Sequence, residues 1–202
     1  MTAIEGVTVA ALPMALSWLR PPASWSSEGG ELKIGAGPST DWFANPAGGT
    51  PVLNAPVLVG RPPDEHFTLL ARVRIDGAST FDAGVLFIHA DDTTWAKLCL
   101  EVSPQGQPMI VSVVTRRVSD DCNSQAVEGN EAWLRVARVS GAFAFHASAD
   151  GERWELVRFF ALPAHDVDVG FAAQSPTGVG CSASFRDLVY ANRRLGDLRD
   201  GS

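Results

Sequence analysis

Hydrophobic and polar residues alternate with a period of two along much of this chain, the pattern of a β-strand with one face in a core. The stretch FTLLARVRID, residues 67–76, is the clearest example. Residues 84–89 and 109–114 are apolar at nearly every position and rich in β-branched side chains, which predicts central strands covered on both faces. The pattern therefore predicts a β protein from residue 67 onward.

Gly, Pro, Asp, Asn and Ser break the sequence into these stretches at short intervals, and further strands are expected at 133–139, 142–148, 167–174 and 181–190. The first sixty residues are rich in Pro and Gly and hold short strand candidates such as 31–34. Residues 116–130 are polar and read as a long loop, and only the tail after Asn192 hints at a helix. We expect an all-β sandwich of two stacked sheets.

The length of 202 residues fits one large domain better than two. We expect an N-terminal extension over residues 1–15, the sandwich domain over 16–192 and a C-terminal tail over 193–202. Because sheet edges can pair between subunits, a homodimer fits this architecture.

Composition narrows the location and the partners. The net charge of −7, with scattered Lys and Arg, disfavours nucleic acid as a partner. The segment before residue 15 carries Glu5 and no basic residue, unlike a secretory leader, and no stretch approaches the roughly 20 apolar residues that span a bilayer. Three cysteines without a CxxC pair suit a reducing compartment, so we expect a cytoplasmic protein that has no membrane partner.

The stretch TTWAKLCLEV, residues 93–102, carries the main functional hypothesis. Alternation places Trp95, Lys97 and Glu101 on the side away from the core. Lys97 and Glu101 are about 13 Å apart along a strand, so they cannot pair with each other and need other partners. One interpretation is a sugar-binding face where Trp95 stacks on a sugar ring; the other is an ordinary polar face bonded to neighbouring strands.

Other residues are candidates to share this face. Arg135 alternates outward from its strand, where it could meet Glu101. Asp41 and Trp42 are candidates to rim the groove, although Trp42 could instead close the core. Thr115 and Asp120 flank the polar loop. Asp120, Asp121 and Asn123 could offer oxygens to a structural Ca²⁺, but their spacing matches no known calcium loop, so we expect no cofactor.

Five short strings occur in the order found in one family: TDWF (40–43), FDAGVL (81–86), WAKLCLE (95–101), SVVT (112–115) with Ser119-Asp120, and SADGERW (148–154). Together they resemble the uncharacterised family named after a regulation-of-enolase protein, which is grouped with the concanavalin A-like lectins and glucanases. The resemblance implies a concanavalin A-like jelly roll and glycan binding without an established activity. Ala83 and Asp121 depart from the family pattern, and the second change removes an aromatic residue from the polar loop.

The residues together predict a lectin-like domain that binds a carbohydrate or similar hydroxyl-rich ligand without turning it over. Two alternatives stay open: a glycoside hydrolase, and a protein-interaction or regulatory module that uses the same face. The glucanases of this superfamily carry Glu-x-Asp-x-Glu on one strand, whereas Glu101 is followed by Val-Ser-Pro-Gln. A hydrolase would therefore need a second carboxylate from another strand, such as Asp82. Lys97 could also lower the pKa of Cys99.

Overall fold

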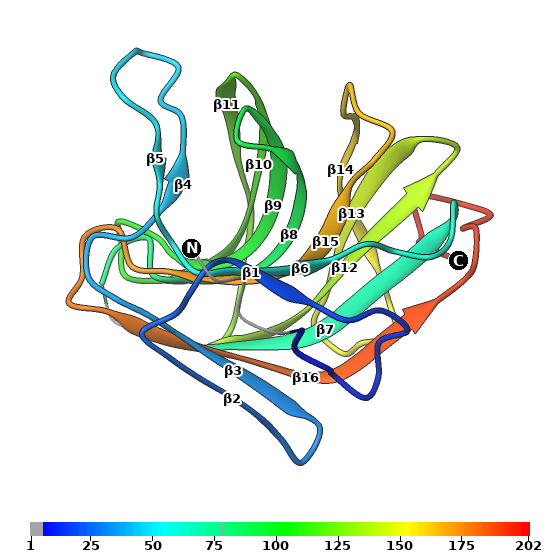
Figure 1. Ribbon diagram of the computed structural model, residues 1–202, viewed down its shortest axis with the longest axis horizontal. Coiled ribbons are helices and arrows are strands. Elements are labelled where there is room, and N and C mark those ends of the chain that lie inside the picture. The colour runs from blue at the N-terminus through cyan, green and yellow to red at the C-terminus, as the bar shows by residue number, and fades with distance from the viewer. Residues whose placement is uncertain (1–5, 78) are drawn as a thin grey trace.

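The computed structural model describes residues 6–77 and 79–202, which form β-strands, turns and irregular segments without a helix. Two seven-stranded sheets contain most of the strands, and every pairing within them is antiparallel. The sheets pack face to face as a sandwich (Figure 1). The predicted all-β sandwich is confirmed.

The first sheet, in spatial order, consists of β1 (Ser17–Arg20), β6 (Val57–Gly60), β15 (Asp168–Gln174), β8 (Ala83–Asp91), β9 (Thr94–Val102), β10 (Pro108–Arg116) and β11 (Val118–Ala126). The second sheet consists of β14 (Glu155–Ala161), β13 (Ala142–Ser148), β12 (Glu131–Val139), β7 (Phe67–Asp76), β16 (Cys181–Ala191), β3 (Glu31–Ala36) and β2 (Ser24–Glu28). The short strands β4 (Trp42–Phe43) and β5 (Val52–Leu53) form a separate hairpin.

The main core lies between the two sheets and takes one face of nearly every strand. Leu98 and Leu100 of β9 pack there with Val73 of β7 and Phe185 of β16, all with 0% of their surface exposed. Burial on this scale is the main favourable contribution to folding. The central strands β8 and β10 are buried along most of their length, as their apolar sequences predict.

Strands β8 to β11 curve, and their hollow side faces away from the second sheet (Figure 1). The β4–β5 hairpin stands on that hollow side. Its apolar residues pack on the sheet in a second cluster, separate from the main core, that includes Trp42, Phe87, Trp95, Val113 and Ala172. This arrangement gives the first sheet a covered area beside an open one on its concave face.

Two expectations about irregular segments are wrong. Residues 116–130 do not form a loop, because β11 pairs with β10 from Val118 to Ala126 and its polar sequence reflects an edge strand. The tail after Asn192 forms turns rather than a helix. Within it, the backbone amide of Gly196 donates a hydrogen bond to the carbonyl of Ser202.

The expected division of the chain at residues 15/16 and 192/193 stays a prediction. In the structure, Val7, Val9 and Leu12 of the first segment pack with the main core. Leu195 of the tail packs on Ala137 and Ala144 on the outer side of the second sheet. The described parts of both flanking segments therefore cover surface of the sandwich, and residues 1–5 of the expected extension lie outside the described residues.

Candidate functional site

Strand register fixes which side chains reach the concave face of the first sheet. Ala96 and Leu98 of β9 point into the main core, so the alternate residues Trp95, Lys97 and Glu101 point to the concave side, as predicted. The neighbouring strands place Phe87 and Val113 beside Lys97. The concave face therefore carries charged groups within an apolar surface.

Trp95 does not lie in an open trough, and the expectation that it stacks on a ligand is wrong. Its side chain is 0% exposed because Trp42 of the hairpin packs edge-on against it, with ring centroids 5.9 Å apart. Trp42 is 1% exposed and donates a hydrogen bond from Nε1 to the carbonyl of Ala55 at 3.0 Å, so it does not rim the groove either. These two indoles fasten the hairpin to the sheet.

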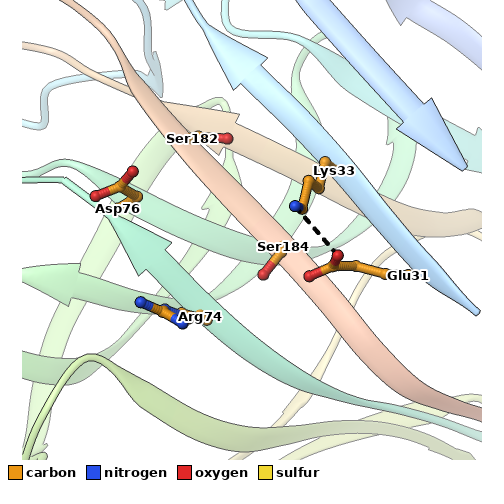
Figure 2. Close-up of a pocket in the computed structure, with 6 residues that line it drawn as sticks. All are labelled: Glu31, Lys33, Arg74, Asp76, Ser182 and Ser184. Carbon is orange, nitrogen blue, oxygen red and sulfur yellow. Dashed lines mark ion pairs between the residues drawn. The ribbon is translucent and has the colours of Figure 1, made fainter. Parts of the chain in front are cut away.

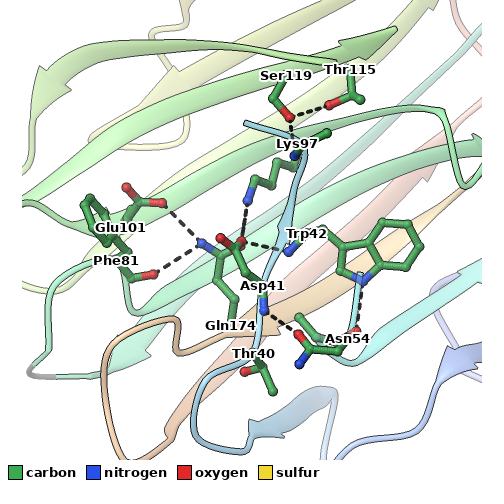
Figure 3. A network of polar contacts seen from close by, with 12 residues as sticks. Thr40, Asp41, Trp42, Asn54, Phe81, Lys97, Glu101, Thr115, Ser119 and Gln174 are labelled. Atoms are coloured by element: carbon green, nitrogen blue, oxygen red, sulfur yellow. Dashed lines mark hydrogen bonds and ion pairs between the residues drawn. The ribbon is translucent and has the colours of Figure 1, made fainter. Parts of the chain in front are cut away.

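Lys97 is buried beside this aromatic cluster and has two hydrogen-bond partners (Figure 3). Its Nζ donates to Oδ1 of Asp41 at 3.0 Å and to Oε1 of Gln174 at 2.8 Å. Burial alone would lower the pKa of Lys97, but Asp41, together with Cys99 and Glu101, outweighs it and the pKa is raised. The ammonium therefore stays charged and ties the hairpin to β9.

Gln174 links Lys97 to Glu101, so the two charged residues share a partner although they do not touch (Figure 3). Since Oε1 of Gln174 accepts from Lys97, its Nε2 donates to Oε2 of Glu101 at 3.4 Å and to the carbonyl of Phe81 at 3.3 Å. Burial raises the pKa of Glu101 from 4.5 to about 8. With this pKa the protonated carboxylic acid is the major form of Glu101 at pH 7, and that form can donate a hydrogen bond.

These groups line a pocket of about 120 Å³. Its walls combine a polar floor with two phenylalanine rings, and the lining residues are Asp41, Phe43, Phe81, Lys97, Glu101, Val113, Asp121 and Gln174. Ligand pockets for drug-sized molecules occupy about 300–1,000 Å³, so this one suits a single small unit. It lies where the hairpin ends and the concave face opens.

Phe81 is an aromatic residue of this pocket that is open to solvent. Its side chain is 38% exposed, and its backbone has φ = 70°, a conformation that bulky residues rarely adopt. The following residue, Asp82, is buried and accepts hydrogen bonds from Ser175 Oγ at 2.6 Å and from the amide of Ser79 at 3.0 Å. These bonds hold a strained turn that presents Phe81 at the rim.

Asp121, rather than the predicted Asp120, lines the pocket. On β11, Asp121 is paired with Val113 on the concave side, whereas Asp120 is paired with Val114, which points to the main core. Asp120 instead forms an ion pair with Arg158 of β14 at 2.9 Å. The polar sequence of residues 116–130 indicates a loop, and a loop has no alternating faces. The sequence therefore does not show that Asp121, rather than Asp120, points to the concave side.

The sequence reasoning also missed Phe43, Phe81 and Gln174 as pocket residues. Phe43 and Phe81 belong to TDWF and FDAGVL, two of the strings that carried the family resemblance, so the signal was present but was assigned to the fold. Gln174 ends an apolar strand, and a single amide at a strand end gives no sequence signal by itself.

Arg135 and Thr115 lie outside the pocket. Arg135 belongs to β12 of the second sheet, where its guanidinium lies 4.2 Å from the Trp154 ring and is covered by the tail at Gly201. It cannot meet Glu101, because the main core separates the two sheets. Thr115 is 0% exposed on the concave face, and its hydroxyl is bonded to that of Ser119 at 2.9 Å. The Ser119 hydroxyl also accepts a hydrogen bond from the backbone amide of Ala44, next to the β4–β5 hairpin. Thr115 therefore helps to hold the hairpin through Ser119.

The structure bears on two chemical hypotheses, a reactive thiol at Cys99 and a calcium site on β11. Burial raises the pKa of Cys99 well above its usual value despite the nearby Lys97, so the expected activation of this thiol is wrong. Asp120 lies on the opposite face of β11 from Asp121 and Asn123, so these three cannot converge on one calcium ion. Within residues 6–77 and 79–202, no group of three His, Cys, Asp or Glu side chains is placed to hold a metal.

A second depression, of about 250 Å³, lies on the outer face of the second sheet (Figure 2). It is lined by Glu31, Lys33, Arg74, Asp76, Ser182 and Ser184. Lys33 is 54% exposed and pairs with Glu31 at 3.2 Å. The lining has no aromatic group and no buried polar group comparable with Glu101, so the concave pocket is the stronger candidate.

Comparison with known proteins places the chain in a family. Residues 18–193 match the model of the family described as protein of unknown function (DUF1349). The chain belongs to this family. The resemblance to the regulation-of-enolase family is not tested by this match and stays a prediction. No curated protein matches the sequence.

Solved structures support the fold. A functionally unknown protein from Saccharomyces cerevisiae superposes with a TM-score of 0.80 and 26% identity, over 87% of this chain and 95% of that one. The GH43 protein BlXynB from Bacillus licheniformis gives 0.68 and 16%, over 88% of this chain and 37% of its own. A xylan β-1,4-xylosidase from Bacillus halodurans gives 0.65 and 16%, over 86% and 36%. The chain thus corresponds to little more than a third of these two larger chains.

The described residues contain no helix that is both long and apolar enough to cross a membrane.

The ion pair between Lys97 and Asp41 generates a prediction about stability. Asp41→Asn leaves a buried ammonium without a counter-charge and should lower the free energy of unfolding by about 3 kcal/mol. Lys97→Met, which fills the same space with an apolar chain, should cost less, and Asp41→Asn in the Lys97→Met background should cost almost nothing. Urea denaturation of the four proteins gives this double-mutant cycle. Equal costs of Asp41→Asn in both backgrounds would show that the pair is not coupled.

The raised pKa of Glu101 generates a second prediction. Between pH 4.5 and about 8 the folded protein keeps a proton on Glu101 that the unfolded chain releases, so the free energy of unfolding falls as pH rises. The slope reaches at most about 1.4 kcal/mol per pH unit and disappears above the folded pKa. Glu101→Gln stays neutral and should lack this component. Denaturation of both proteins from pH 5 to 9 measures it, and parallel curves would contradict the assignment.

Proposed function

We propose that the concave pocket binds a small hydroxyl-rich ligand, such as one unit of a carbohydrate, without turning it over. The observation that carries this proposal is that an exposed aromatic ring, Phe81, a buried carboxyl group, Glu101, and a second carboxyl group, Asp121, line one small pocket. A sugar presents an apolar C–H face and hydroxyls that both donate and accept hydrogen bonds. The three groups are complementary to these features.

Each group has a separate role in this proposal. Phe81 packs against the C–H face of the ring. Glu101 donates a hydrogen bond from its protonated carboxyl, and Asp121 accepts from ligand hydroxyls. Asp41 and Lys97 act through the pocket shape, because their own charges are paired and hold the hairpin in place. Trp95 supports the hairpin from below and does not touch the ligand.

The names of the structurally similar chains favour a carbohydrate as the ligand class. Two of them are called a GH43 protein and a xylan β-1,4-xylosidase, and in both the matched part is about a third of the chain. At 16% identity this likeness shows the fold alone. It supports the proposal only by indicating that this fold occurs within proteins named for carbohydrate chemistry.

Hydrolysis is the second candidate, because the pocket holds a protonated acid together with other carboxyl groups. Glu101, with its pKa near 8, has the protonation state of a general acid, and Asp121 and Asp41 line the same pocket. Asp41 is committed to Lys97, which leaves Asp121 as the partner. This pair replaces Asp82, the partner suggested by the sequence, which is buried in the turn beside Phe81.

The test is a binding titration with paired substitutions. Phe81→Ala and Asp121→Asn should each weaken binding of a monosaccharide or disaccharide panel, followed by NMR titration, by at least about tenfold. Both side chains are exposed, so the free energy of unfolding should change by less than about 1 kcal/mol. Analysis of the ligand after incubation separates the two functions: an intact sugar supports binding alone, and a cleaved one supports hydrolysis.

The chain offers a matched control for each substitution. Phe159→Ala removes an aromatic ring that is 54% exposed on β14 and does not line the pocket, and Asp120→Asn alters a carboxylate on the other face of β11. Neither should change the affinity. A panel in which no sugar binds, or in which the controls weaken binding as much as the pocket variants, would overturn the proposal.

The remaining expectations from the sequence are also proposals. They are a cytoplasmic location, no nucleic-acid partner, no membrane partner and a homodimer formed through sheet edges. A protein-interaction role for the concave face also stays open as a prediction, and capture of a polypeptide rather than a sugar in this pocket would support it.

A further inference from the structure

The positive charge of Lys97 in the concave pocket is already paired with Asp41. Lys97, the one cation among the described residues that line it, is 2% exposed and is bonded to Asp41 and Gln174. No ammonium or guanidinium of the lining is free to meet an anionic ligand. A carboxylate on the ligand would therefore enter without a counter-charge.

The carboxylate of Asp121 in the same pocket is not balanced by an ion pair within the part of the chain that the structure describes. Asp121 forms no ion pair with any described residue, and Arg158, the nearest cation on the neighbouring edge, pairs with Asp120 on the other face of the strand. Because the Lys97–Asp41 pair is neutral as a unit and Glu101 is protonated at pH 7, the lining carries one net negative charge. Partial burial removes some of the hydration of Asp121 and raises its pKa, although Lys97, the backbone amide of Cys122 and Arg158 act in the opposite direction. A cation beside this carboxylate would restore the lost stabilisation.

The aromatic rings at the rim also suit a cation. Phe43 already lies 6.0 Å from the Lys97 ammonium, which shows that a positive charge is accommodated against its ring. Phe81 adds an exposed ring to the same pocket. A carboxylate and aromatic rings that line one pocket are the groups that recognise an ammonium ligand.

We propose that the pocket selects an ammonium-bearing, hydroxyl-rich ligand of the amino-sugar class, with its ammonium at Asp121 and its ring against Phe81. Sugars with a carboxylate are rejected because they meet Asp121 and no free cation. Neutral sugars bind more weakly through the same hydroxyl contacts. This inference rests on the proposed function, since it names the ligand class of the same site.

The experiment compares three sugars of nearly the same size that differ in charge: D-glucosamine, D-glucose and D-glucuronate. NMR titrations at pH 6.5 with the full chain and low salt should show D-glucosamine binding about fivefold more tightly than D-glucose, and D-glucuronate more weakly than either. Asp121→Asn should bring D-glucosamine and D-glucose to equal affinity. Asp120→Asn should leave the preference unchanged, and 1 M NaCl should reduce it in the unmodified protein.

The outcomes separate this inference from the function on which it rests. Equal affinity for D-glucosamine and D-glucose, or a preference for D-glucuronate, would overturn the charge selection while leaving a sugar-binding pocket. Preference for D-glucosamine that survives Asp121→Asn would overturn the role of Asp121. The absence of binding by all three sugars would overturn both the charge selection and sugar binding at this site.

Discussion

The ion pair between Lys97 and Asp41 is the interaction on which the candidate site depends. It joins the centre of a buried strand to a hairpin that has only two short strands of its own. A buried ammonium is costly unless it is paired and hydrogen-bonded, and here Asp41 and Gln174 supply both needs. The same bonds orient Gln174 toward Glu101 and Phe81. The ammonium of Lys97 therefore helps to fix the position of the hairpin and the orientation of Gln174 in the pocket.

The fold could be predicted from the sequence because it depends on a pattern that repeats in every strand. Alternation in residues 67–76 and 93–102 identifies the core face without knowledge of any partner strand. The same argument placed Trp95, Lys97 and Glu101 on the concave face correctly. It also showed that Lys97 and Glu101 need separate partners, and the structure supplies them through Asp41 and Gln174.

The site could be predicted only in part, because alternation gives a direction but not what lies above the sheet. Trp95 points outward as expected, yet the hairpin covers it, and that contact joins residues 53 positions apart. Arg135 also points outward, but from the other sheet, which its own strand cannot reveal. Asp121 was missed for a different reason: an edge strand exposed to solvent has no apolar face, so its polar sequence resembles a loop.

We propose that the ligand is recognised in the part of the concave face that the hairpin leaves open, where Phe81, Glu101 and Asp121 line the pocket. A crystal of the full chain soaked in mixed monosaccharides tests this most directly. We predict electron density for one sugar in this pocket, with a hydroxyl within hydrogen-bond distance of Glu101. Density that appears instead at the outer depression beside Arg74, with the concave pocket unoccupied, would contradict it.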